Sequence, residues 1–329
     1  MESKSHKLAV LMPVFNGGEI FLRSVISCAG SGLAPDEYEL IVVDNCSTDG
    51  IPEGLPPFDP QGAPIRVYRN EANLGRVGNW NRAVDIAVAE GFEFVTFLFV
   101  GDVWLPNGSL PRLLAVMRRH HALIGFSSFR SIGPEDDLRL HWAPLPVSSE
   151  SVITSTGEIA ARLLGCAHFP LGPIQANIYR LASAADLRFE PERSRTTDVD
   201  DTADFLFQQD GAAVIVRDPF FAWRERSDRF QYTMDIEVQL SDKIDIFKRA
   251  VSRCGSIRVN SRRSLAYLLL VLLKMAGNEA RGWGLLKIRL RTILSMFRDE
   301  NRPSAYWLAR ALYEKLILRR RFLYFENGA

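Results

Sequence analysis

Leu8–Val14 reads LAVLMPV, an uninterrupted apolar run of strand length near the start of the chain. Two later runs have the same character, ELIVV at residues 39–43 and FVTFLFV at residues 94–100. Residues 65–68 (IRVY) are a weaker fourth candidate. Strands that are apolar on both faces are typical of parallel sheets covered by helices on both sides. These segments therefore predict the strands of one sheet.

Amphipathic segments between these strands predict helices over residues 19–31, 77–89 and 110–121. Strand and helix in alternation indicate a doubly wound α/β sheet. Residues 131–155 are rich in Pro, Ser and charge and predict a long surface loop. The later pattern predicts a helix at residues 156–164 and a strand or buried segment at 174–179. It then predicts an acidic helix at about 200–209 and a strand at 212–216.

Composition places the 329-residue chain among ordinary globular proteins. Hydrophobic residues make up 47% and charged residues 24%, which excludes disordered, collagen-like and coiled-coil proteins. Four cysteines without paired spacing argue against a zinc site or a disulfide framework and suggest a reducing compartment. No signal peptide is visible in residues 1–7, so we expect a cytoplasmic protein.

Polar residues follow three of the predicted strands where each one ends. The first strand runs into Asn16, the second into Asp44, and the run at 94–100 into Gly101-Asp102. Ligands of open α/β sheets bind at the carboxyl ends of the strands, so these ends predict one cleft. Asp44 is either a turn residue or a hydrogen-bond acceptor for a base or ribose. Asp102 is either a turn or capping residue or a ligand of Mg²⁺ or Mn²⁺, which favour carboxylate and phosphate oxygens.

Two common nucleotide-binding motifs are absent from the sequence. No Gly-x-Gly-x-x-Gly follows the first strand, and no Gly-Lys-Ser/Thr occurs anywhere. Neither an oxidoreductase on a Rossmann sheet nor a P-loop nucleotide site is therefore expected.

Four ordered motifs at strand ends resemble those of the family 2 inverting glycosyltransferases, over about residues 8–224. Similar to the family's patterns are Pro13-Val14-Phe15-Asn16, the run Val42–Gly50 (VVDNCSTDG), Asn73-Leu74-Gly75 with Asn81, and Gly101-Asp102 followed by Trp104-Leu105-Pro106. The resemblance implies a GT-A fold with a doubly wound mixed sheet. It also implies sugar transfer from a nucleotide-diphosphate donor to a hydroxyl of a glycan or lipid-linked glycan in polysaccharide biosynthesis. UDP is the first candidate for the donor nucleotide. The donor-binding residues it implies are Pro13, Val14, Phe15, Asn16, Asp44, Asn73, Gly75, Arg76, Asn81, Gly101, Asp102 and Arg224.

The chain departs from the family at the implied metal motif. Val100 stands where the family has its first aspartate, and Val103 stands where another often follows. Asp102 alone remains to hold Mg²⁺ or Mn²⁺ through the donor diphosphate, as the resemblance implies. One carboxylate plus the diphosphate is enough for such a metal, but the departure motivates an alternative function, a catalytically silent protein that binds nucleotide sugars or acts as a scaffold.

An acidic segment, residues 198–204 (DVDDTAD), precedes Gly211 and the last predicted strand. The resemblance implies that inverting transfer takes its general base from such a segment, about a dozen residues before the glycine. Counting back from Gly211 makes Asp200 the first candidate and Asp201 the second. The other interpretation is a solvated acidic turn at a helix N-terminus, which the helix dipole favours. Arg224 is suited to the departing diphosphate, because guanidinium matches phosphate oxygens in a bidentate way.

The C-terminal region differs from the rest of the chain. We therefore expect two parts, a GT-A-like domain at residues 1–235 and a basic helical region at residues 236–329. Residues 262–329 hold 14 Lys/Arg against 5 Asp/Glu. The longest apolar run there, residues 265–273, is shorter than the roughly 20 residues of a membrane span. The region either lies on an anionic membrane surface, packs on the first domain, or forms a homodimer interface. No nucleic-acid-binding motif accompanies the charge.

Overall fold

The computed structural model describes residues 7–50, 52–133, 138–140, 150–153, 173–182, 187–190, 202, 205, 211–224, 287 and 309. The predicted helix at 156–164, both predicted base residues and nearly all of residues 236–329 lie outside these ranges. Within the predicted acidic helix, Thr202 and Phe205 are described, and both are helical.

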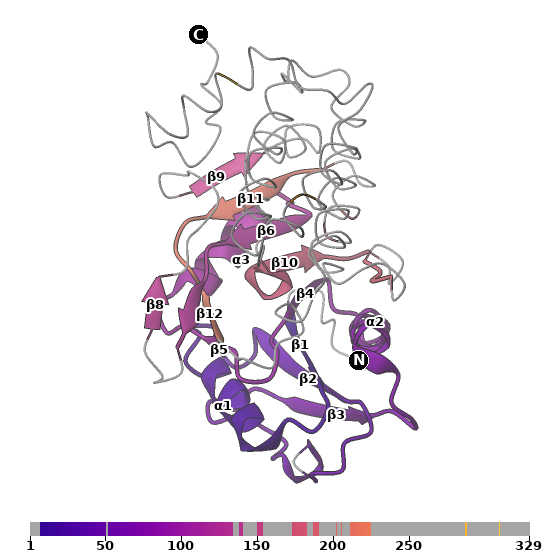
Figure 1. The fold of residues 1–329 in the computed structure, drawn as a ribbon. Coiled ribbons are helices and arrows are strands. Elements are labelled where there is room, and N and C mark those ends of the chain that lie inside the picture. The colour runs from indigo at the N-terminus through magenta and orange to yellow at the C-terminus, as the bar shows by residue number, and fades with distance from the viewer. Residues whose placement is uncertain are drawn as a thin grey trace.

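The main sheet has eight strands and mixed direction (Figure 1). Its parallel half consists of β3 (Ile65–Arg69), β2 (Tyr38–Asp44), β1 (Leu8–Val14) and β4 (Phe94–Phe97), in that order. β10 (Asn177–Arg180) follows and runs antiparallel to both of its neighbours, β4 and β6 (Ile124–Ser127). β11 (Ala213–Val216) lies next to β6, and β9 (Glu150–Ile153) forms the far edge of the sheet. The structure thus confirms an α/β fold with a mixed sheet and the four predicted strands of the first hundred residues. The run at 94–100 ends earlier than predicted, at Phe97.

The prediction of a long surface loop over residues 131–155 is wrong. β8 (Leu138–Leu140) and β9 lie inside this range, and β7 (Arg130–Ile132) enters it. β7 and β8 join β5 (Val103–Trp104) and β12 (Phe221–Arg224) in a second sheet of order β5-β12-β7-β8. β8 and β9 are edge strands of three and four residues. Strands so short show no reliable period, because a period of two needs several residues to become visible.

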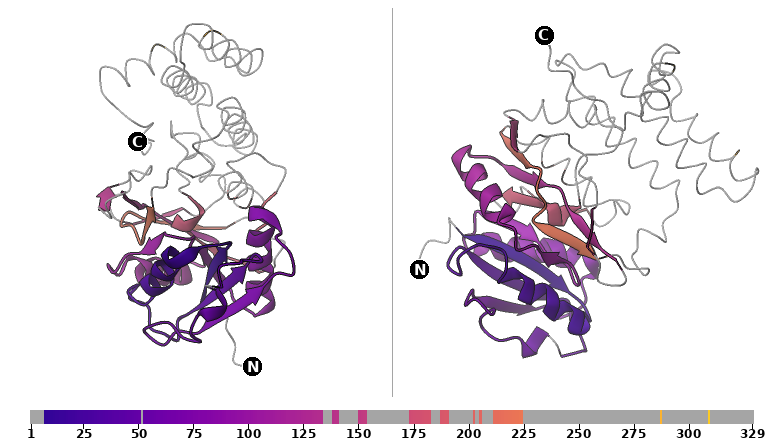
Figure 2. Two further views of the ribbon diagram at one scale, coloured as in Figure 1. Left: turned by 60° about the horizontal axis from the view of Figure 1, so that its bottom comes forward. Right: turned by 90° about the vertical axis from the view of Figure 1, so that its left-hand side faces the viewer.

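Helices cover both faces of the parallel half, as predicted. α1 (Gly18–Cys28) and α2 (Gly75–Ala89) lie on opposite sides of β1–β3 (Figures 1 and 2). α3 (Ser109–Arg119) shares the hydrophobic cluster of α1. Two single turns of 3-10 helix, η1 (Pro52–Gly54) and η2 (Ile174–Ala176), complete the described elements.

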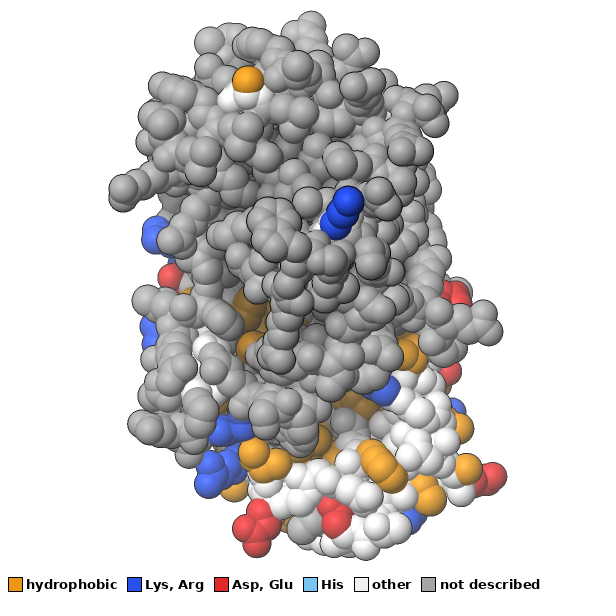
Figure 3. Space-filling model, in the orientation of Figure 1, with side chains coloured by type: hydrophobic (Ala, Val, Ile, Leu, Met, Phe, Trp, Pro, Cys, Tyr) orange, Lys and Arg blue, Asp and Glu red, His pale blue; other side chains and the backbone are white. Residues whose placement is uncertain are grey.

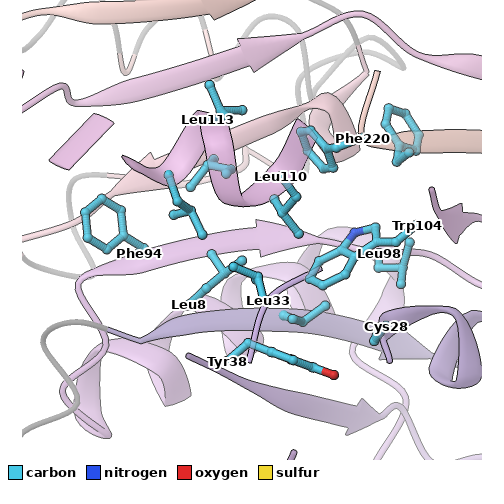
Figure 4. Close-up of a cluster of buried hydrophobic side chains, with 14 of the residues drawn as sticks. Leu8, Cys28, Leu33, Tyr38, Phe94, Leu98, Trp104, Leu110, Leu113 and Phe220 are labelled. Carbon is cyan, nitrogen blue, oxygen red and sulfur yellow. The ribbon is translucent and has the colours of Figure 1, made fainter. Parts of the chain in front are cut away.

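The hydrophobic core explains why the strands are apolar on both faces. Alternate residues of β1, such as Leu8 and Val10, pack with Cys28 of α1 and Leu110 of α3; Figure 4 shows the side chains of this cluster converging between the sheet and the helices. On the other face, Trp80 of α2 packs against Phe97, with ring centroids 6.2 Å apart. Burial of both faces fixes the sheet, and the strand ends therefore become a rigid platform for polar residues.

Candidate active site

Half of the residues predicted to bind a donor line one pocket at the carboxyl edge of the parallel strands. A pocket of about 300 Å³ opens there between the end of β1, the end of β2 and the start of α2. Its walls are Pro13, Val14, Phe15, Asn45, Asn73, Gly75, Arg76, Asn79 and Trp80. Six of these nine, Pro13, Val14, Phe15, Asn73, Gly75 and Arg76, are predicted donor-binding residues.

Aromatic side chains form one wall of this pocket. Trp80 stacks on Phe99 with ring centroids 5.0 Å apart, and the Arg76 guanidinium lies 4.9 Å from the centre of the Trp80 ring. At the rim, Phe15 and Leu74 are each 49% exposed; Figure 3 shows hydrophobic side chains exposed among polar ones over the described lower part of the molecule. Exposed aromatic and guanidinium planes are suited to stacking on a flat ring such as a nucleobase.

A network of four asparagines, three of which line the pocket, joins the pocket walls. Asn45 donates to Asn73 Oδ1 (2.7 Å) and accepts from the Leu74 amide (2.8 Å). Asn70 donates to the side-chain oxygens of Asn45 (3.0 Å) and Asn79 (2.8 Å). Asn79 in turn donates to the Val43 carbonyl of β2 (3.0 Å). The network therefore fixes the entry of α2 against the end of β2.

Sequence reasoning missed Asn45, Asn70, Asn79 and Trp80. Asn45, Asn70 and Asn79 are 3%, 8% and 3% exposed. Buried amides require partners, so three asparagines in the ten residues 70–79 were the available signal.

Asn16 and Asp44 lie beside the pocket rather than in its lining. The side-chain oxygen of Asn16 accepts from the Thr48 backbone amide (2.8 Å), and the backbone amide of Asn16 donates to Ser47 Oγ (2.9 Å). Asp44 is buried, accepts from the Ser47 amide (2.9 Å) and pairs with Arg69 (2.8 Å). The hydrogen bond to Asp44 raises the pKa of the Arg69 guanidinium. Both residues hold the loop after β2 in place.

Asn81 acts as a clamp on a distant segment. Its side chain donates to the Phe189 carbonyl (2.8 Å) and accepts from the Phe189 amide (3.0 Å). Phe189 packs edge-on against Trp80, with centroids 5.4 Å apart. Asn81 therefore supports the aromatic wall indirectly and does not line the pocket.

Gly101, Asp102 and Arg224 come together at the end of β4. Asp102 is fully buried, and its carboxylate accepts from the Arg224 amide (2.9 Å) and from Gln175 Nε2 (2.7 Å). The side-chain Nε of Arg224 donates to the Gly101 carbonyl (3.1 Å). Two segments more than 120 residues apart are thus joined at this point.

These described residues do not fit a resident Mg²⁺ or Mn²⁺. Asp102 is the single predicted metal ligand, and both of its oxygens already accept hydrogen bonds within the protein. Among the residues that the structure describes, no group of three or more His, Cys, Asp or Glu side chains could hold a metal ion. Mg²⁺ is usually held by one or two carboxylates together with water and substrate phosphates, but the one carboxylate here is already bonded to Gln175 and to the Arg224 amide, so we derive no step through a metal.

The predicted base residues Asp200 and Asp201 lie outside the described residues. The neighbouring Thr202 is buried, and its Oγ1 lies 2.7 Å from the hydroxyl of Tyr179 on β10. Phe205 packs edge-on against the same tyrosine, with ring centroids 5.5 Å apart. Thr202 and Phe205, which follow the predicted bases in the sequence, therefore both contact Tyr179 of the sheet.

Comparison with known proteins identifies the family of this domain. The model of glycosyl transferase family 2 matches residues 9–168, which hold the whole pocket and Asp102. Residues 9–168 form a family 2 glycosyltransferase domain. Arg224 and the predicted bases lie beyond the matched residues.

Two curated proteins are similar to this glycosyltransferase domain. The putative teichuronic acid biosynthesis glycosyltransferase TuaG of Bacillus subtilis is 26% identical over 161 residues, 48% of this chain and 59% of TuaG. The poly(ribitol-phosphate) beta-N-acetylglucosaminyltransferase TarS of Staphylococcus aureus is 29% identical over 116 residues, 35% of this chain and 20% of TarS. This chain thus spans less than two thirds of the length of either relative.

A solved structure shares the fold. Residues 1–349 of S. aureus TarS, in complex with UDP-GlcNAc, align with 89% of this chain at 17% identity and a TM-score of 0.57, and 89% of that chain is covered. The likeness confirms the GT-A type of fold. Within the described ranges, no helix combines the length and apolarity needed to cross a bilayer.

Proposed function

We propose that the protein is an inverting glycosyltransferase that moves a sugar from a nucleotide-diphosphate donor, UDP first, to a hydroxyl of a glycan or lipid-linked glycan. One observation carries the proposal. Six residues chosen from sequence motifs, spread from Pro13 to Arg76, line a single pocket at the carboxyl edge of a family 2 domain. TarS, which shares the fold, was solved with UDP-GlcNAc, which supports UDP as the donor nucleotide.

The chemistry of the proposed reaction requires three groups in line. The acceptor oxygen forms a bond to the anomeric carbon, while the bond from that carbon to the diphosphate oxygen breaks on the opposite face. The diphosphate leaves with the electron pair, and the acceptor proton passes to a general base. Asp200 is our first candidate for this base and Asp201 our second. The negative charge on the leaving diphosphate must be stabilised by fixed donors or cations.

The acceptor proposal rests on chemistry that the relatives' names share. Teichuronic acid and poly(ribitol-phosphate) are hydroxyl-rich polymers. We propose polysaccharide biosynthesis on the cytoplasmic side of a membrane, with the basic region 236–329 holding the enzyme at anionic lipids. In the competing arrangements, this region packs on the first domain or forms a homodimer interface.

A catalytically silent donor-binding protein or scaffold is the second candidate. Val100 and Val103 flank Asp102 where carboxylates would serve a metal, and Asp102 itself is engaged by Gln175 and Arg224. Such a protein would bind the donor in the same pocket without transfer.

A donor and acceptor screen separates the two functions. The full chain is incubated with UDP-, GDP- and dTDP-sugars and a panel of hydroxyl-bearing glycan acceptors, and NMR reads the anomeric configuration of any product. Transfer with inverted configuration from one donor is the expected result. Tight binding of one donor with neither transfer nor hydrolysis across the panel supports the silent protein. Retention of configuration overturns the proposed mechanism. Asn73→Ala, at the pocket wall, should weaken donor binding, whereas Asn107→Ala, an exposed loop asparagine, should not.

A further inference from the structure

Arg224 places a guanidinium directly over the backbone that follows β4. Its Nε donates to the Gly101 carbonyl (3.1 Å), and its Cδ would lie 3.1 Å from a Cβ built on Gly101. Gly101 also has a φ of +87°, a region that residues with side chains rarely adopt. Glycine at this position therefore allows the arginine to lie close against the strand end.

Asp102 anchors the backbone that carries this guanidinium. Its Oδ1 accepts from the Arg224 amide and its Oδ2 from Gln175, and the side chain is fully buried. A buried carboxylate is costly unless hydrogen bonds or opposite charge compensate it. These contacts are those of a carboxylate that positions another group.

The Gly101–Arg224 contact lies next to the pocket that we assign to the donor. A Cβ built on Gly17 would lie 2.9 Å from Val14, which lines the pocket, and 3.3 Å from Val100. Gly101 follows Val100, and Ile20 lies 3.4 Å from a Cβ built on Gly101. Gly17, in the short loop after β1, is therefore close both to the pocket residue Val14 and to Val100, the residue before Gly101.

We propose that Arg224 supplies the fixed positive charge for the donor diphosphate, that Asp102 positions Arg224, and that diphosphate binding requires no divalent metal. The inference rests on the proposed donor-binding function and reassigns Asp102 within it. A guanidinium carries five N–H donors in a planar fork that matches phosphate oxygens. The Nε–H of Arg224 donates to the Gly101 carbonyl, and this hydrogen bond orients the fork. Arg224 is then a ligand-binding residue and Asp102 a positioning residue.

The test measures binding of UDP and of uridine to the full chain by calorimetry, in EDTA and in MnCl₂. Arg224→Gln removes the guanidinium and its charge but keeps a polar side chain, and Asp102→Asn keeps one acceptor oxygen and removes the other. Arg112→Gln is the matched control, because this half-exposed arginine pairs at 3.6 Å with Asp218 on the surface. Electron paramagnetic resonance of Mn²⁺ with UDP present reports directly whether the protein binds the metal.

We expect wild-type UDP affinity to change less than about threefold between EDTA and Mn²⁺. Arg224→Gln should weaken UDP about 10- to 100-fold, the range for losing charge-assisted hydrogen bonds, and leave uridine affinity unchanged. Asp102→Asn should weaken UDP by a smaller factor that is the same in EDTA and in Mn²⁺. Arg112→Gln should bind as wild type.

Several results would overturn the proposal. A wild-type UDP affinity that falls at least tenfold in EDTA, with a protein-bound Mn²⁺ signal that Asp102→Asn abolishes, makes Asp102 a metal ligand and leaves the donor-binding function intact. An Arg224→Gln protein that binds UDP as wild type removes the assigned cation. Should either variant fail to fold, the wild-type EDTA and resonance measurements still decide the question. If no nucleoside diphosphate binds with or without metal, both the inference and the proposed function are wrong.

Discussion

Replacing Asn45 with alanine tests how the donor pocket is built. Asn45 is 3% exposed. Its amide donates to Asn73 Oδ1 (2.7 Å) and the Gly75 carbonyl (3.3 Å), and its oxygen accepts from the Leu74 amide (2.8 Å) and Asn70 Nδ2 (3.0 Å). Asn45→Ala removes all four hydrogen bonds. At a net ~0.5–1.5 kcal/mol for each, allowing for partial replacement by water, the free energy of unfolding should fall by about 2–4 kcal/mol.

Urea unfolding followed by circular dichroism gives this free energy, and calorimetry gives the affinity for UDP. Because Asn73 and Gly75 line the pocket, the variant should also bind UDP about tenfold more weakly, or ~1.4 kcal/mol. Asn107→Ala is the control: Asn107 is exposed, donates to the Pro219 carbonyl (2.7 Å) and accepts from the Ser109 amide (3.1 Å). It should cost about 1 kcal/mol or less, since water replaces exposed partners.

The reasoning fails if the two alanine variants lose the same stability, or if Asn45→Ala loses less than about 1 kcal/mol. Either result would mean that water replaces the partners of Asn45 as easily as those of an exposed asparagine. A loss of stability with unchanged UDP affinity would contradict only the link between the asparagine network and donor binding. The stability argument would stand.

Three further predictions follow from the site and its surroundings. Asp200→Asn should lower transfer by ~10²–10⁴-fold with UDP affinity nearly unchanged, because the base acts on the acceptor; inactivity of Asp201→Asn instead, measured in the same assay, would shift the assignment by one residue. Burial first, and the hydrogen bond to Asp59 second, raise the pKa of Tyr38, so its contribution to stability is full below about pH 10 and lost as pH rises further. Urea midpoints between pH 8 and 11 should fall less steeply for Tyr38→Phe than for wild type, and equal slopes would contradict this. The full chain should pellet with anionic vesicles and be released by high salt, whereas equal recovery in the supernatant with anionic and neutral vesicles would favour packing of residues 236–329 on the first domain.

The sequence was informative where an element is long enough to show a local pattern. The parallel strands β1–β4 and the three helices follow from long apolar runs and amphipathic segments, and six of the twelve predicted donor-binding residues line one pocket. The second sheet could not be predicted, because β5 and β12 pair Trp104 with Phe221 through strands of two and four residues. Contacts at that separation have no local pattern.

The two aspartates show a second limit. Asp44 is the last residue of β2, as predicted, whereas Asp102 lies five residues beyond the end of β4, and the direction of each carboxylate depends on a distant partner. Asp44 is taken by Arg69, 25 residues later, and Asp102 by the amide of Arg224, 122 residues later. A strand-end carboxylate without such partners would be open to a ligand. The same residue type in the same place therefore allows opposite roles.

The strand order gives the proposed reaction its spatial logic. The sheet runs β2-β1-β4-β10, and the parts of a nucleotide sugar follow the same order in the proposed function. In this proposal the nucleoside binds at the ends of β2 and β1, where the asparagine network and Trp80 form the pocket. The diphosphate binds toward β4, where Asp102 accepts from the Arg224 amide. The acceptor binds toward β10, where the hydroxyls of Tyr179 and Thr202 lie 2.7 Å apart, and Thr202 follows the two predicted bases in the sequence. Because each part contacts a different strand end, damage at one position should affect one step: nucleoside affinity, diphosphate affinity or transfer.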